Sequence, residues 1–193
     1  VTERHLNEEI MRLRLHLLQF AALHAHDELL IETLDCLGRL AGSPLGFFHF
    51  VEADQRTLSL QVWSTETTER ACQAEGRGRH YDIAEAGIWC DCVRQRRPVI
   101  HNDYPNEPGR RGLPEGHAPI ARELTVPVFR NERIVAVVGL ANKASDYDAA
   151  DIDLVAQVAD LVWDIVERKQ AEAERAKLQA QLLQAQKLES VGR

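Results

Sequence analysis

The sequence predicts an α+β domain that lies between two long helices, one at each end of the chain. Short apolar stretches come in pairs separated by turn-forming residues, as in the hairpins of an antiparallel sheet. Residues 148–191 contain neither Gly nor Pro and repeat apolar side chains at helical spacing. The two terminal helices leave roughly 120 of the 193 residues for a globular core, which is the size of one ordinary domain.

The first predicted helix covers about residues 2–25. Its apolar side chains form one narrow stripe in alternating steps of four and three, namely Leu6, Ile10, Leu13, Leu17 and Phe20. Because the rest of the helix is polar, we expect this stripe to pair with a second copy of the chain in a dimeric helix bundle. The alternative is that the helix packs only on its own domain, as amphipathic helices commonly do.

The core begins with a predicted helix over residues 28–40, with Asp27 as a candidate cap and an end before Gly42 and Pro44. Strands are predicted over residues 46–51 and 58–62, with a turn between them. A polar connection then leads to three short predicted elements: a strand at 81–83, a helix over 87–95 and a strand over 99–102.

A long segment, residues 103–121, has seven Gly or Pro residues and no hydrophobic period. A loop of this length inside a compact domain is usually functional or disordered. Strands are predicted beyond it, over 124–128 and 134–140, with a turn at 130–133. The last strand is apolar on both faces, which is typical of a central strand covered on both sides.

The C-terminal helix changes character along its length. Its first half is apolar enough to pack on a domain, whereas residues 167–187 are rich in Ala, Glu, Gln, Lys, Arg and Leu. A helix that leaves its domain needs a partner, and we expect a weak dimeric coiled coil through Val162, Val166, Leu178 and Leu182. A weak seam can slide or rotate, which suits a transmitter of signals. The alternative is a solvated, charged helix without a partner.

Charge and cysteine content exclude several classes of protein. The net charge of -7 argues against a nucleic-acid partner, and no apolar run is long enough to predict membrane contact. The four cysteines are too scattered for a disulfide framework, so we expect reduced thiols and a cytoplasmic location. Cys90 and Cys92 lack the usual spacing of a zinc site, and no metal site is predicted, although a metal or redox role for this pair is an alternative.

The order of elements and several local sequences resemble the GAF domain, a ligand-sensing relative of PAS domains. The segments that carry the resemblance are AGIW (86–89), RQRRPVIHND (94–103), GH (116–117), LTVPV (124–128) and GLANK (139–143). The resemblance covers about residues 27–166. It implies a six-stranded antiparallel sheet with dimerisation helices on one face and a pocket on the other, roofed by segments within 64–121.

The last ten residues, QAQKLESVGR (184–193), resemble the segment that precedes the phosphoacceptor histidine of sensor histidine kinases. The resulting domain hypothesis is an N-terminal dimerisation helix (1–26), a GAF sensory domain (27–166) and a coiled-coil signalling helix (167–193) that leads to a kinase domain in cis. No covalent bilin is expected. The tetrapyrrole-binding GAF branch attaches its chromophore to a cysteine beside a histidine, and this sequence has no such pair.

The predicted ligand site comprises eight residues in or next to the roof: His49, Trp63, Tyr81, Trp89, His101, Asn102, Asp103 and Glu123. Each has an ordinary structural alternative. Trp89 can fill the core, and Asn102 and Asp103 are typical turn formers. His49 has apolar neighbours, so it is either a core histidine or a haem or metal ligand.

The sequence therefore predicts a homodimeric, cytoplasmic sensory module of a two-component histidine kinase, with an unknown small-molecule ligand, an unassigned cofactor and no catalysis of its own. One alternative is a thiol-dependent reductase that uses Cys90 or Cys92 and is related to GAF-fold methionine sulfoxide reductases. A second alternative is a ligand-free dimerisation spacer.

Overall fold

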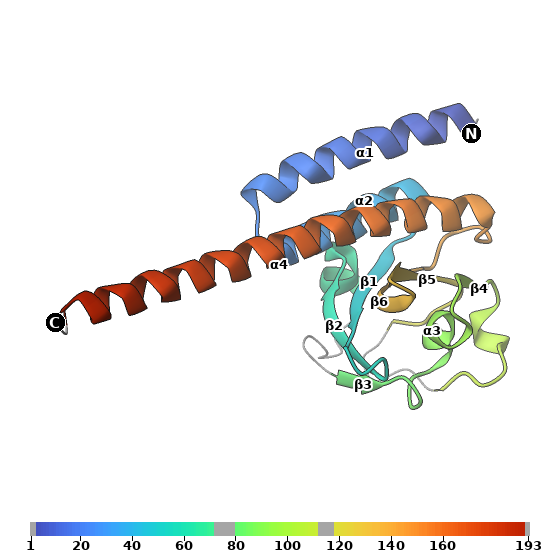
Figure 1. Ribbon diagram of the computed structural model, residues 1–193. Coiled ribbons are helices and arrows are strands. Elements are labelled where there is room, and N and C mark those ends of the chain that lie inside the picture. The colour runs from blue at the N-terminus through green and yellow to red at the C-terminus, as the bar shows by residue number, and fades with distance from the viewer. Residues whose placement is uncertain (1–2, 72–79, 112–117, 192–193) are drawn as a thin grey trace.

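The computed structural model describes residues 3–71, 80–111 and 118–191, without the side chains of 3–6, 70–71, 80–81 and 189–191. It contains one six-stranded sheet in the order β3-β2-β1-β6-β5-β4, in which every pair of neighbours is antiparallel. Three helices, α1, α2 and α4, lie on one side of this sheet, and α3 lies on the other (Figure 1). The predicted α+β class and antiparallel sheet are confirmed.

The strands are short at the edges and long in the middle. Their bounds are β1 (Leu45–Val51), β2 (Thr57–Trp63), β3 (His80–Asp82), β4 (Val99–His101), β5 (Glu123–Arg130) and β6 (Arg133–Ala141). β6 lies between β1 and β5, as its apolar sequence predicted. The β5–β6 hairpin turns at Asn131 and Glu132, where φ is 48° and 62°, and two successive positive φ values are typical of the type I′ turn that joins two-residue hairpins.

The helices are α1 (Glu3–Leu23), α2 (His26–Ala41), α3 (Asp91–Gln95) and α4 (Ala149–Val191), with shorter turns at η1 (Thr67–Ala71), η2 (Ile88–Cys90) and η3 (Tyr104–Asn106). The predicted cap of α2 was wrong by two residues. Ala25 precedes the helix, and its backbone N–H donates to the Glu28 carboxylate at 2.8 Å, so Asp27 lies in the first turn instead.

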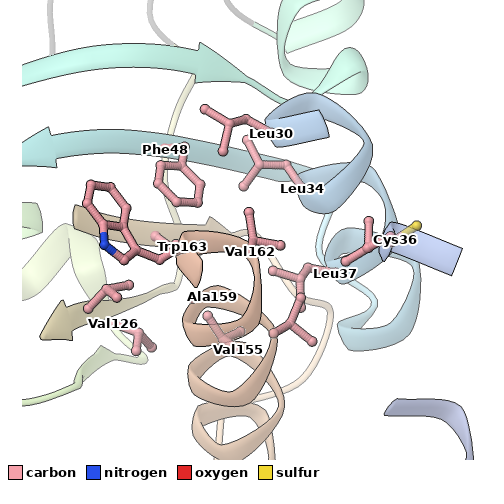
Figure 2. Close-up of a cluster of buried hydrophobic side chains, with 14 of the residues drawn as sticks. Leu30, Leu34, Cys36, Leu37, Phe48, Val126, Val155, Ala159, Val162 and Trp163 are labelled. Carbon is pink, nitrogen blue, oxygen red and sulfur yellow. The ribbon is translucent and has the colours of Figure 1, made fainter. Parts of the chain in front are cut away.

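The main hydrophobic core lies between the sheet and the helices. Leu30, Leu34 and Leu37 of α2 face Val155, Ala159 and Val162 of α4, above the strand residues Phe48 and Val126 (Figure 2). Most of these side chains are completely buried. Because burial of a large aliphatic or aromatic side chain contributes about 1.5–3 kcal/mol, this layer accounts for much of the stability of the domain.

The α1 stripe belongs to this same core. Ile10, Leu13, Leu17 and Ala21 are buried with the residues of α2 and α4, and Phe20 packs against them. In this fold the stripe is therefore covered by the chain's own helices, which is the alternative considered from the sequence. Val162 and Val166 are likewise fully buried in the core, so these positions are not available to a second chain. The side chain of Leu6 lies outside the described part.

α4 is one continuous helix of 43 residues. Asp148 caps it by accepting the N–H of Ala150 at 2.8 Å, and the carboxylate of Asp151 accepts the N–H of Asp148 at 3.0 Å. One face of its first half is buried in the core, whereas every residue from 170 to 188 is exposed. The second half extends away from the domain (Figure 1).

The long segment over 103–121 is held at both of its described ends. Tyr104, Ala118 and Ile120 are buried in a small cluster with Leu45 and Ala141 at one end of the sheet. Residues 112–117 between them lie outside the description. None of the described helices has the length and apolar character needed to cross a membrane.

Candidate functional site

The sheet face opposite the three long helices carries most of the polar side chains buried on the strands. In β5, Leu124 and Val126 point to the helical core, so Glu123 and Thr125 point to the opposite face. His101 of β4 is paired in register with Glu123, which places its side chain on that same face. The two neighbouring strands thus position a histidine and a carboxylate side by side.

An aromatic group forms the first part of this candidate site. The rings of His49 and Trp89 lie 4.9 Å apart between centroids, and the Phe47 ring meets each of them edge on. Gly139 leaves room for Phe47, because a Cβ at that glycine would lie 2.1 Å from Phe47 Cζ. Burial lowers the pKa of His49 to about 3, so this histidine is neutral at physiological pH.

A histidine between two carboxylates forms the second part. His101 Nδ1 lies 3.6 Å from Glu123 Oε2, and His101 Nε2 lies 3.7 Å from Asp91 Oδ2 at the start of α3. Interaction with the Glu123 carboxylate raises the pKa of His101, and burial opposes it. The side chains of His101 and Glu123 are 8% and 4% exposed, so this charge cluster is nearly dehydrated. Such an arrangement can exchange a proton or bind a ligand that donates hydrogen bonds.

The short helical segment above this face is held by Arg94. Its guanidinium donates to the backbone oxygens of Gly87 and Ile83 at 3.0 and 2.6 Å and to Asp91 at 2.7 Å. These bonds fix Trp89 and Asp91 over the sheet. Arg94 thus acts as a structural clamp rather than as a free cation for an anionic ligand.

The other four predicted site residues belong neither to the aromatic group nor to the histidine–carboxylate group. Asn102 holds the backbone of Tyr147, donating to its oxygen at 3.1 Å and accepting from its N–H at 2.9 Å. Asp103 is exposed and accepts from the Asn106 amide, so it serves a turn. Trp63 is half-buried at the end of β2, and Tyr81 pairs in register with Leu58, but its side chain lies outside the description.

The thiols near this face are poor nucleophiles. Cys90 and Cys92 are completely buried and free. Burial raises the pKa of the Cys90 thiol to about 12, and it raises the pKa of the Cys92 thiol as well. Because the thiolate is the reactive form, neither thiol is prepared for catalysis or redox sensing in this arrangement.

An open cleft of about 460 Å³ lies elsewhere, between the end of α2 and the segment after β2. It includes the charged residues Asp35, Arg39, Glu66 and Glu69, and none of the eight predicted ligand residues lines it. Asp35 is already engaged, since it accepts the N–H and the hydroxyl of Thr65 at 2.8 and 2.6 Å. Sequence reasoning missed this cleft. The sequence signal for the cleft was the pair of opposite charges Asp35 and Arg39, one helical turn apart, followed by the small residues Gly42 and Ser43.

Comparison with known proteins agrees with the fold. The family model described as GAF domain matches residues 24–167. A methyl sulfide methyltransferase-associated sensor of Methanosarcina acetivorans is 39% identical over 135 residues, which cover 69% of this chain and 13% of that protein. The chain therefore spans a small part of the length of this relative.

Solved structures with the same fold have low sequence identity. The GAF domain of a phosphoenolpyruvate-protein phosphotransferase from Acinetobacter has a TM-score of 0.68 at 13% identity, over 89% of this chain and 97% of that one. The free methionine-R-sulfoxide reductase of Neisseria meningitidis, in complex with its substrate, has a TM-score of 0.64 at 16% identity, over 84% and 91% of the two chains. At these identities the similarity concerns the fold alone.

Proposed function

This chain belongs to the GAF domain family, and on that basis we propose that it is a sensory module that passes the state of a bound ligand on through α4. The ligand is a small molecule that binds on the sheet face of His49, Trp89, His101 and Glu123. The module has no catalysis of its own. Its role is to convert ligand binding into a displacement of the long helix.

One chain of contacts carries this proposal. His101 is the last residue of β4, and the next residue, Asn102, holds the backbone of Tyr147 through two hydrogen bonds. Tyr147 directly precedes Asp148, which caps α4. A ligand that shifts His101 therefore shifts the start of α4 through three consecutive contacts. The Tyr147 hydroxyl is also hydrogen-bonded to Ser43 at 2.8 Å, which anchors this junction to the end of α2.

β5 supplies a second connection between the site and the helix. Glu123 and Thr125 face the site, and Leu124 and Val126 pack in the core that contains the first half of α4. Because packed interiors resist small volume changes, a displacement of this strand is passed to α4. α4 continues without a break into its exposed half, which suits transmission to a following domain.

The proposal also covers the cellular location of the module and the domain that receives its signal. The name of the archaeal relative, a methyltransferase-associated sensor, supports a sensory role. We place the module in the cytoplasm, in agreement with the free thiols of Cys36, Cys90 and Cys92. Its output is a histidine kinase domain in cis, on the grounds of the kinase-like segment at residues 184–193.

The proposed homodimer uses surfaces that the domain leaves uncovered. Met11, Leu15 and Leu18 form an exposed stripe on α1 to one side of its buried one, and Leu178 and Leu182 are exposed on α4. Exposed apolar side chains at helical spacing are suited to a second copy of the chain. Leu15→Glu and Leu182→Glu together should convert the dimer to a monomer in light scattering. A wild-type chain that is monomeric at micromolar concentration would contradict the dimer.

Thermal unfolding in the presence of a panel of small metabolites tests ligand binding. A ligand at a hundredfold excess over its Kd stabilises the chain by about 2.7 kcal/mol, which gives a clear rise in Tm. His101→Ala should abolish the rise, and the control variant His24→Ala, which removes a ring that stacks on Phe20 beyond the helical face, should keep it. If no compound changes the Tm of the wild type, the ligand-free spacer becomes the better description.

Hydrogen exchange of the α4 backbone tests transmission separately. In the wild type, ligand should change exchange in the first turns of α4. Asn102→Ala should retain the ligand-dependent Tm shift and lose this change, because the bonds to Tyr147 are gone. An unchanged response in Asn102→Ala would mean that the signal does not pass through this junction.

The reductase alternative is tested by the double variant Cys90→Ser, Cys92→Ser. A sensor without catalysis shows no thiol-dependent turnover of methionine sulfoxide in either form. Turnover by the wild type that disappears in the double variant would establish the enzyme and overturn the proposal.

A further inference from the structure

Three side chains with metal-binding atoms converge between α1 and α2. His16 extends from α1, and Glu32 and Cys36 lie one turn apart on α2. His16 Nε2 lies 2.7 Å from Glu32 Oε1, and Cys36 Sγ lies 3.3 Å from the same oxygen. Among the described residues these three donor atoms all lie within 4.8 Å of one another.

The donor set matches one class of metal ion. Imidazole nitrogen, thiolate sulfur and carboxylate oxygen together are typical ligands of zinc, at bond lengths of about 2.0–2.3 Å. Ligands at those lengths around a tetrahedral ion lie roughly 3.3–3.7 Å from each other. The two separations from Glu32 therefore need changes of about half an ångström or less, and His16 and Cys36 lie within 4.8 Å of each other, so rotation of the His16 and Glu32 side chains can bring the three donors to an ion.

The surroundings leave access to an ion. The His16 side chain is 49% exposed and the Glu32 side chain 24%, so the site is open to solvent on one side. Cys36 is buried at its base, and its sulfur points away from the hydrophobic cluster (Figure 2). Three protein ligands with an open position would leave the fourth corner of the tetrahedron for water.

One neighbour competes with a metal ion. Arg39 donates to Cys36 Sγ at 2.9 Å and lies 3.8 Å from Glu32 Oε1, so its guanidinium partly fills the place of the cation. The Arg39 side chain is 66% exposed and can move into solvent. The site should consequently bind a divalent ion, with an affinity that Arg39 reduces.

We infer that His16, Glu32 and Cys36 form a binding site for a zinc-class divalent ion that fastens α1 to α2. The ion replaces the thiol proton of Cys36, which is released to solvent, and the oxidation states do not change. Because α1 also carries the exposed stripe of Met11, Leu15 and Leu18, an occupied site would hold that stripe in one orientation. This inference concerns a surface on the helical side of the sheet and is independent of the proposed ligand site.

Titration of the reduced, chelator-treated chain with Co²⁺ tests the site. Co²⁺ takes the place of zinc and gives a thiolate-to-metal charge-transfer absorption when a cysteine binds it. We expect one Co²⁺ per chain with this absorption, displaced by Zn²⁺, and a rise in Tm on adding Zn²⁺. His16→Gln should lower the affinity at least about tenfold, and its fold is not at risk because the side chain is half-exposed. Cys36→Ser should remove the absorption.

Two matched variants complete the test. Cys90→Ser should keep the full absorption, since Cys90 lies on the other face of the sheet. Arg39→Gln should raise the affinity roughly three- to tenfold, because it removes the competing cation. Binding without a charge-transfer absorption, or an absorption that survives both His16→Gln and Cys36→Ser, would overturn the inference. An affinity that falls in Arg39→Gln would also contradict it.

Discussion

The two faces of the sheet differ in what they bury. The helical face buries aliphatic and aromatic side chains such as Phe48, Leu124 and Val138, sealed by α2 and α4. The opposite face also has apolar residues, but among them it buries His49, His101 and Glu123. Burial of polar groups costs free energy unless they are paired, so the opposite face, where such groups are buried, is the one that we propose for the ligand. One strand serves both roles, because successive residues of β5 point to opposite faces.

The largest expected difference between the faces is in the stability lost when one of two adjacent phenylalanines is replaced. Phe48 is fully buried under the helices, whereas Phe47 is half-buried beside Trp89. Phe48→Ala should lower the free energy of unfolding by about 3–5 kcal/mol, and Phe47→Ala should cost clearly less, because the Phe47 side chain is only partly buried. Urea unfolding followed by circular dichroism measures both. Equal costs would show that the two faces are packed alike.

The second-largest expected effect on the free energy of unfolding concerns α1, which packs on the helical face. Leu17 is fully buried, so Leu17→Ala should lower the free energy of unfolding by about 2–4 kcal/mol. Met11 is 64% exposed on the same helix, and Met11→Ala should stay within about 0.5 kcal/mol of the wild type at concentrations where the chain is monomeric. The same urea titration compares them. A negligible cost for Leu17→Ala would mean that α1 is not packed on the domain in solution.

His49 should make the opposite face sensitive to acid. Its pKa is about 3 in the folded chain and near 6.5 when unfolded, so below pH 6.5 the unfolded state binds a proton that the folded state does not. Its contribution to stability is complete above pH 6.5 and falls by roughly 2 kcal/mol between pH 8 and pH 5. His49→Leu should remove that part of the pH dependence, measured as the difference between the two proteins. Parallel curves for wild type and variant would refute a neutral, buried His49.

His101 should give a smaller effect of opposite sign. Its pKa is raised in the folded chain, mainly by Glu123, so its stabilising contribution is complete below the unfolded pKa of 6.5. That contribution is lost as the pH rises through the folded pKa. His101→Gln should therefore destabilise the chain more at pH 5.5 than at pH 8.5. NMR titration of the His101 ring gives the pKa directly, and a value below 6.5 would contradict the assignment.

Much of the fold could be predicted from the sequence. The lack of Gly and Pro after Tyr147 predicted α4, and the two-sided apolar run predicted β6 at the centre of the sheet. These features depend on local chemistry, which the sequence contains. The cap of α2 was wrong because the Glu28 side chain reaches back to Ala25, a choice that local sequence does not decide.

Four of the eight predicted ligand residues lie in contacting pairs. His49 with Trp89, and His101 with Glu123, are brought into contact by strand pairing and by the placement of the η2 turn (Ile88–Cys90) over the sheet. Asn102 was selected as a ligand residue and instead joins β4 to the start of α4. Nothing in its local sequence shows that Tyr147, 45 positions away, lies within hydrogen-bond reach.

The sequence by itself determined which faces of the helices and strands are apolar, because side-chain periodicity is a property of the chain. The tertiary structure alone decided which other surfaces those faces pack against. The α1 stripe looked suited to a second copy of the chain, and its residues Ile10, Leu13 and Leu17 are instead buried in one core with α2 and α4. The convergence of His16 with Glu32 and Cys36 follows from that packing, since an apolar stripe specifies burial but not the surface that provides it.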